Sequence, residues 1–228
     1  MRPQGNARRA RAGSIQVSFC RVLDHRLGFI RRFYLTAVMP FEATQRKIVK
    51  IKETHLSRGE DAPDGSLEEE WNDATKCVQV VGQCCLGLLE KALHDYLRVF
   101  IERGGGIEKK SGNWFKSYSD FLTQRTTFTW EGSPVTYNQL EQINLSRNDY
   151  SHDPAIDSDQ PIQSEDHFEK HPRSRFIDEL EKVILTAKDG KEPDFPISLS
   201  VTKHKLFSAL SDVKRFCAFV DTQRAETR

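Results

Sequence analysis

One stretch of regularly spaced apolar residues limits the fold of this chain more than any other feature. From Ser66 to Phe100, apolar side chains recur three or four positions apart over more than about eight turns, which predicts one long helix. Residues 66–69 read Ser-Leu-Glu-Glu, a capping box that marks its start, and three glycines at 104–106 mark its end. Because a helix this apolar must be covered by other elements, we expect it at the centre of the fold.

Several shorter segments show the same helical spacing. They are residues 41–56, 113–123, 136–152, 176–186 and 203–223. Residues 197–201 alternate apolar and polar side chains, which predicts a short extended segment, and the polar, proline-containing residues 153–172 predict a long loop. The predicted fold is therefore all-α: an antiparallel bundle of five or six helices with at most one short β element.

The composition favours a cytoplasmic globular protein. Apolar residues make up 37% and charged residues 29% of the chain, and the most apolar stretch, Cys77 to Leu97, is interrupted by charged side chains. No membrane helix is therefore expected. The five cysteines form no CxxC pair, which favours reduced thiols, and we expect neither a cofactor nor a metal site. The net charge of +1 argues against a broad electrostatic binder of nucleic acid.

The first 38 residues differ from the rest of the chain. They carry eight arginines and one acid, Asp24. Three interpretations remain open: a basic arm that touches nucleic acid, an Arg-rich transit peptide, or upstream sequence outside the working domain, with Met39 as the true start. We favour the third, because Pro40 and a long helical pattern follow Met39. Residues 1–38 are then a basic N-terminal extension that is either disordered or not part of the working domain, and 39–228 form the helical domain.

The most chemically distinctive run is residues 147–152, Arg-Asn-Asp-Tyr-Ser-His, at the end of a predicted helix. Pro154 disfavours helical geometry at the residue before it, so His152 lies at or near the helix end. Asn148 and His152 are four positions apart and share a helix face, whereas Arg147 and His152 are five apart. If the helix packs against its symmetry mate, two arginines and two histidines converge at one two-fold cleft.

These residue types suit the cleavage of RNA by its own 2′-hydroxyl. Histidine titrates near neutral pH and moves protons, and a position near a helix C-terminus favours its protonated form. The arginine fork matches phosphate oxygens and stabilises the developing negative charge. Asn148 holds either the imidazole or the ribose. The alternative is that residues 147–152 simply end a helix in an unrelated interaction protein.

The pattern Arg147-Asn148-x-x-x-His152, at a helix end in an all-helical domain, resembles the signature of the HEPN family (higher eukaryotes and prokaryotes nucleotide-binding domains). The resemblance covers residues 40–222 in helical layout and six residues in motif. It implies a metal-independent endoribonuclease that dimerises through the motif helices, often in a toxin–antitoxin or other defence system. Arg147 and His152 would be catalytic, and Asn148 would support them.

The resemblance also implies partners and an alternative function. The expected partners are an RNA substrate, a second copy of the chain and an antitoxin or other regulatory protein. Some HEPN toxins carry a tyrosine, modified by a partner enzyme, two residues after the histidine; here that residue is Pro154. Some HEPN domains are catalytically silent, so the alternative is an inactive HEPN-like module that binds nucleotide or a protein.

Three other histidines are candidate site residues. His167 and His171 are four apart, as metal ligands on a helix often are, but Pro172 follows directly and no third ligand is evident. We therefore expect them to be solvated loop histidines. His94 lies within the long central helix and either faces the cleft or is a satisfied structural histidine.

Overall fold

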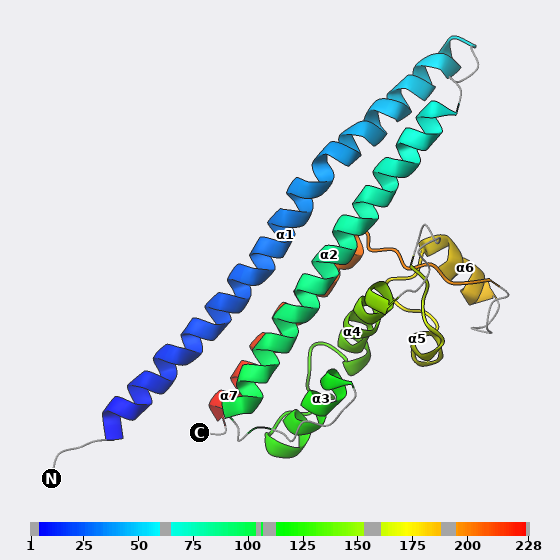
Figure 1. The fold of residues 1–228 in the computed structure, drawn as a ribbon. Helices are drawn as coiled ribbons and strands as arrows, with labels where there is room; N and C mark the ends of the chain where they lie inside the picture. The colour runs from blue at the N-terminus through cyan, green and yellow to red at the C-terminus, as the bar shows by residue number, and fades with distance from the viewer. Residues whose placement is uncertain are drawn as a thin grey trace. The chain divides into compact units, whose positions relative to one another are not determined.

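The protein folds into helices joined by irregular segments (Figure 1). The computed structural model describes residues 5–59, 65–103, 106, 113–152, 161–187 and 195–226, with the backbone alone described at 5–20, 103, 152, 187 and 224–226. The helices are α1 (Gly5–Ser57), α2 (Ser66–Arg103), α3 (Trp114–Arg125), α4 (Tyr137–His152), α5 (Glu165–Lys170), α6 (Glu179–Ala187) and α7 (Lys203–Glu226).

The all-α prediction is confirmed. Over the described ranges the chain has no strand, and its β structure consists of two isolated antiparallel bridges, Ile162–Ser198 and Ile177–Leu199. The predicted extended segment 197–201 supplies one side of both bridges. The described part of the chain has seven helices instead of five or six, because α5 lies inside the predicted loop 153–172. None of these helices has the length and apolar character needed to cross a bilayer.

The chain divides into two compact units, each built from separate parts of the sequence. Unit 1 contains Met1–Ile30, Leu88–Asn144 and Ser208–Arg228, and unit 2 contains Arg31–Gly87 and Leu145–Phe207. Long helices therefore contribute to both units. In unit 1 the core is aromatic: Trp130 stacks on Phe216 at 5.5 Å between ring centroids, and Phe128 meets the Phe216 ring edge-on at 5.8 Å.

In unit 2, the segment before α7 packs closely on α2. A Cβ atom on Gly82 would lie 2.6 Å from the Val201 carbonyl oxygen, so only glycine allows this approach. Beside it the Gln79 side chain accepts from the Val201 amide at 2.9 Å and donates to Ser200 Oγ at 3.2 Å. The first of these contacts satisfies the Val201 amide, next to the two isolated bridges of the same segment.

The starts of α2 and α4 agree with the sequence prediction. α2 begins at Ser66, as the sequence predicts. At α4 the capping box forms in both directions: the Thr136 amide donates to Gln139 Oε1 at 2.9 Å, and the Gln139 amide donates to Thr136 Oγ1 at 3.3 Å. This box fixes the residue at which α4 begins.

α1 is a single helix that runs through Met39 and Pro40 without a break. Before Met39 it buries apolar side chains at Leu23, Leu27, Ile30, Tyr34 and Val38. The helix therefore has no boundary at residue 39. Whether residues 1–38 belong to the working protein stays a prediction.

Candidate active site

The distinctive run 147–152 forms the last turns of α4, which ends at His152. Arg147 and Asn148 are half-buried, and Arg147 Nη1 donates to Asn148 Oδ1 at 3.2 Å. The structure thus brings two of the three predicted site residues into contact. The side chain of His152 lies outside the described residues, so its position relative to the pair is still a prediction.

The last turns of α4 have two distinct faces. Ser146 and Asp149 are buried, whereas Arg147 and Asn148 are half-buried and Ser151 is exposed. At 100° per residue, positions 147, 148, 151 and 152 fall on one side of the helix, and 146, 149 and 150 fall on the other. Arg147 and Asn148 therefore share with Ser151 the face directed toward solvent.

The buried face carries a polar cluster that the sequence did not reveal. Asp149 Oδ2 lies 2.6 Å from His167 Nδ1, and Ser164 Oγ donates to Asp149 Oδ1 at 2.6 Å. A carboxylate only accepts hydrogen bonds, so Nδ1 carries the proton of this contact. Asp149 thereby joins the end of α4 to the start of α5, over a sequence separation of 15 to 18 residues.

This cluster is enclosed in unit 2. The His167 side chain is 0% exposed and that of Asp149 is 5% exposed. His167 Nε2 has no hydrogen-bond partner in the part of the chain that the structure describes, and neither has the Tyr150 hydroxyl. Burial, together with the charge of Asp149, raises the pKa of Tyr150, so its phenol stays protonated at neutral pH.

The prediction that His167 and His171 are solvated loop histidines is wrong. Both are buried, His167 on α5 and His171 directly after it, with ring centroids 6.0 Å apart. Burial follows from the helix that the sequence reading missed: Ser164 caps α5 by accepting from the His167 amide. The run Ser-Glu-Asp at 164–166 was the available signal, a cap followed by acids in the first turn. No cluster of three potential metal ligands occurs among the described residues.

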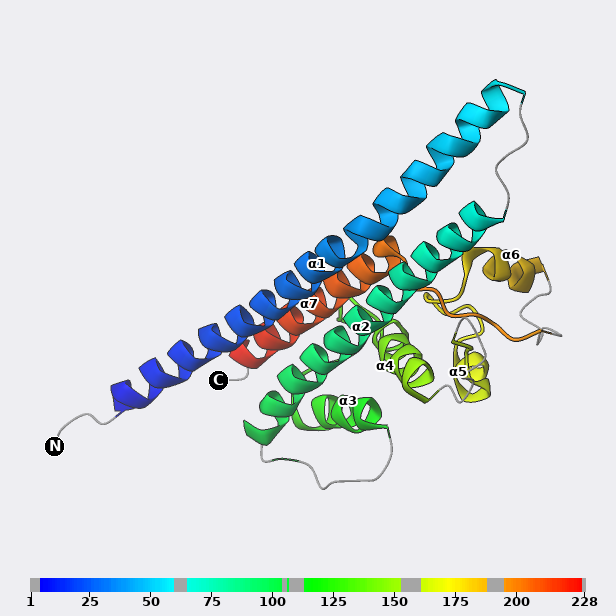
Figure 2. The same cartoon turned by 45° about the horizontal axis from the view of Figure 1, so that its top comes forward.

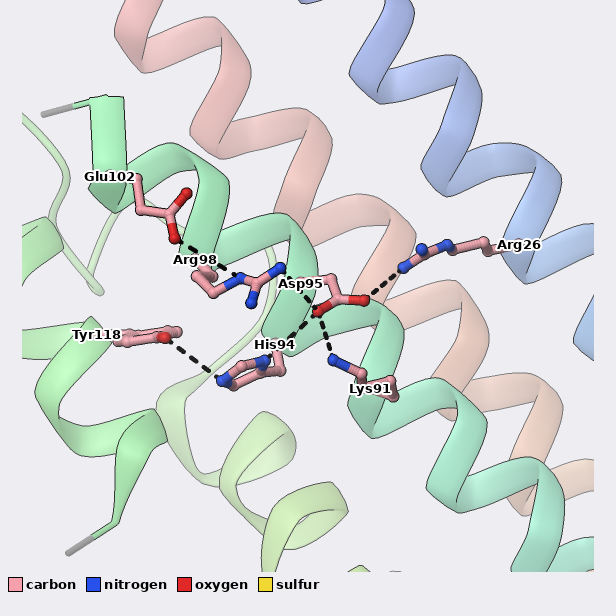
Figure 3. A network of polar contacts seen from close by, with 7 residues as sticks. All are labelled: Arg26, Lys91, His94, Asp95, Arg98, Glu102 and Tyr118. Atoms are coloured by element: carbon pink, nitrogen blue, oxygen red, sulfur yellow. Dashed lines mark hydrogen bonds and ion pairs between the residues drawn. The ribbon is translucent and has the colours of Figure 1, made fainter. Parts of the chain in front are cut away.

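His94 belongs to a different cluster, in unit 1. Its ring packs edge-on against Trp114 at 4.7 Å and stacks with Tyr118 at 5.5 Å, and its Nε2 lies 3.3 Å from the Tyr118 hydroxyl (Figure 3). These contacts attach α3 to α2. His94 therefore has a structural role in packing these two helices.

Next to His94, the Asp95 carboxylate lies between cations from two helices, as Figure 3 shows. It accepts from Lys91 Nζ at 2.6 Å and from Arg26 Nη1 at 2.8 Å. Burial raises the pKa of Asp95, but the hydrogen bonds and charges of Lys91 and Arg26 outweigh burial and lower this pKa from 3.8 to about 2. Asp95 is therefore ionised at any physiological pH and connects α1 to α2.

Comparison of the chain with protein-family models, curated proteins and solved structures found no match. The assignment of a function therefore depends on the residues and geometry described above.

Proposed function

We propose that this protein is a metal-independent endoribonuclease of the HEPN type, acting on single-stranded or loop RNA. The observation that carries the proposal is the contact between Arg147 and Asn148 on the half-exposed face of α4, in a helix that ends at His152. The all-α fold is compatible with the resemblance on which the proposal rests.

The proposed reaction is an internal transesterification followed by release of the 5′ product. The neutral imidazole of His152 in one copy accepts the proton of the ribose 2′-hydroxyl, the 2′-oxygen attacks the adjacent phosphorus, and the bond to the 5′-oxygen breaks. The imidazolium of His152 in a second copy gives its proton to the leaving 5′-oxygen. The products are a 2′,3′-cyclic phosphate and a 5′-hydroxyl.

Arg147 stabilises the charge that develops on the phosphorane oxygens. Its guanidinium is always protonated and offers five N–H donors, of which one is used by Asn148 Oδ1 in this structure. The contact with Asn148 restricts the side chain, so that less entropy is lost when a phosphate binds. Asn148 is thus a positioning residue for the arginine.

A functional unit of two copies follows from the spacing of the motif. Arg147 and His152 lie about 140° apart around one helix, so a second motif helix would bring an arginine from one copy close to a histidine from the other. We include a homodimer through α4 and a neutralising protein partner in the proposal. A defence or toxin–antitoxin role follows from the same resemblance.

The decisive experiment is cleavage of a mixed cellular RNA pool in the presence of EDTA. Wild type is expected to cut, and Arg147→Ala and His152→Ala are each expected to reduce cleavage by roughly a hundredfold or more. Arg125→Ala, which removes an exposed arginine at the end of α3, is the control and should cleave normally. Cleaved 3′ ends should carry the cyclic phosphate. Loss of all cleavage in EDTA, or full activity in both motif variants, would refute the proposal.

The second candidate is an inactive HEPN-like module, and the buried face of α4 favours it in one respect. Asp149 shows that part of the run 147–152 serves the fold, as expected of a helix end with no chemistry. Binding of labelled RNA without cleavage by wild type would select this candidate.

A further inference from the structure

The exposed large apolar side chains of the described residues are concentrated on one helix. Seven of the eleven lie on α1, and five of these fall in unit 2. Four of the five, Leu35, Met39, Val49 and Leu56, share one face of the helix. Their exposed fractions run from 38% for Leu35 to 81% for Leu56. Apolar side chains gathered on one exposed helix face are typical of a binding surface.

These four residues belong to one heptad pattern. Positions 35, 39, 42, 46, 49, 53 and 56 are separated alternately by four and three residues, the spacing of a coiled-coil seam. The positions between the apolar residues are Glu42, Arg46 and Glu53. We call these seven residues the α1 seam; it is about 33 Å long.

The seam borders a groove in unit 2. The groove has a volume of 550 Å³ and is lined by Glu42, Arg46, Val49 and Glu53 of the seam, and on the other side by Trp71 of α2. Figures 1 and 2 both show α1 and α2 side by side in this region. A helix laid along the seam would therefore also contact α2, which enlarges the apolar area that it covers.

The charges of the seam favour an antiparallel over a parallel pairing of two α1 helices. In a parallel pairing of two α1 helices, each residue faces its own copy, so Glu42, Arg46 and Glu53 would each meet a like charge. In an antiparallel pairing in which residue numbers facing each other add up to 88, Glu42 faces Arg46 of the second copy, and Met39 faces Val49. At its centre this register joins opposite charges, with one apolar pair on each side. Further out, Leu35 faces Glu53 and Leu56 faces Arg32, so each of these leucines packs against the aliphatic part of a charged side chain.

We propose that the α1 seam is a self-association surface, on which a second copy of this chain packs antiparallel with Glu42 opposite Arg46. The two-fold axis passes beside position 44, so every contact occurs twice. Within one chain Glu42 and Arg46 already form an exposed ion pair at 3.7 Å. In the dimer this pair becomes a cluster of four alternating charges, flanked on both sides by Met39–Val49 contacts. The surface is independent of the proposed ribonuclease activity.

The test is a charge swap measured by sedimentation equilibrium on the full chain in reducing buffer. Wild type is expected to dimerise through the α1 seam. The separate contact proposed at α4 would join two such dimers and would not respond to the seam variants. Arg46→Glu creates two Glu–Glu contacts and should weaken the dimer by roughly tenfold or more. Glu42→Arg creates two Arg–Arg contacts and should act likewise. The double variant Glu42→Arg/Arg46→Glu restores opposite charges across the interface and should dimerise as wild type does.

The control is Lys47→Glu, which makes the same charge change on an exposed α1 position outside the seam. It should leave the dimer unchanged. Because the Glu42–Arg46 pair is exposed, these variants should melt within a few degrees of wild type, and a circular dichroism scan checks this. A monomeric wild type, a dimer that Arg46→Glu does not weaken, or a double variant that remains monomeric would overturn the proposal.

Discussion

The buried contact between Asp149 and His167 should be one of the most sensitive points of unit 2. Asp149 accepts two hydrogen bonds, one from His167 and one from Ser164, both at 2.6 Å. A hydrogen bond to a charged group contributes about 1.5–3 kcal/mol, and removing one partner leaves the other buried without it. We therefore expect Asp149→Ala and His167→Ala each to lower the free energy of unfolding by about 2–3 kcal/mol.

The double variant separates the contact from the loss of packing. If the two side chains interact, the double variant loses less than the sum of the single losses, with a coupling of about 2 kcal/mol. The assay is urea unfolding followed by circular dichroism at neutral pH, analysed by linear extrapolation. The free energies are comparable if each variant unfolds in one transition with an unchanged slope.

A matched control lies on the same short helix. Asp166 and Lys170 form an ion pair of similar length, 2.7 Å, but their side chains are 68% and 43% exposed. Solvent screening limits such a pair, so Asp166→Ala should cost at most about 0.5 kcal/mol. The reasoning is refuted if Asp149→Ala costs no more than this control, or if the coupling in the double variant is near zero.

Two further predictions concern the packing of α2. Gly82→Ala places a Cβ against the Val201 carbonyl and should destabilise the protein by about 1–3 kcal/mol. Gly87→Ala meets no atom within 4 Å and should stabilise it by up to about 1 kcal/mol. Thermal unfolding should therefore show a lower melting temperature for the first variant and a higher one for the second. The pKa of Asp95 is lowered in the folded state. Its contribution to the free energy of unfolding is therefore complete above the unfolded pKa of about 4 and disappears as the pH falls toward about 2. Asp95→Asn should therefore cost about 1–2 kcal/mol at neutral pH and little near pH 2, and equal losses at both pH values would contradict the assignment.

The long helices could be predicted from sequence because their signals are local. The apolar periodicity of α2 and the capping box of Thr136 and Gln139 require only neighbouring residues, and the structure has both features. The same reasoning placed the end of α4 at His152. It did not predict one unbroken α1, because Pro40 inside a helix removes a backbone hydrogen bond and normally indicates a boundary.

The burial of His167 could not be predicted in the same way. α5 has only six residues, too few to show an apolar period, and its neighbours are polar. What buries it is a contact with Asp149, 18 positions earlier in the chain. Such a pairing of two polar side chains leaves no periodic pattern, and so the sequence predicts a solvated loop here although both histidines are buried.

The two faces of α4 make the run 147–152 sensitive to substitution for two unrelated reasons. In a scan of all single substitutions, changes at Ser146 and Asp149 should reduce the amount of folded protein in the cell, because these residues are buried. Changes at Arg147 and Asn148 should leave that amount nearly unchanged and affect only what the protein does. Substitutions on one face of α4 would thus lower the amount of folded protein, whereas substitutions on the other face would lower its activity. A run in which no residue tolerates substitution would therefore contain fewer catalytic residues than its length suggests.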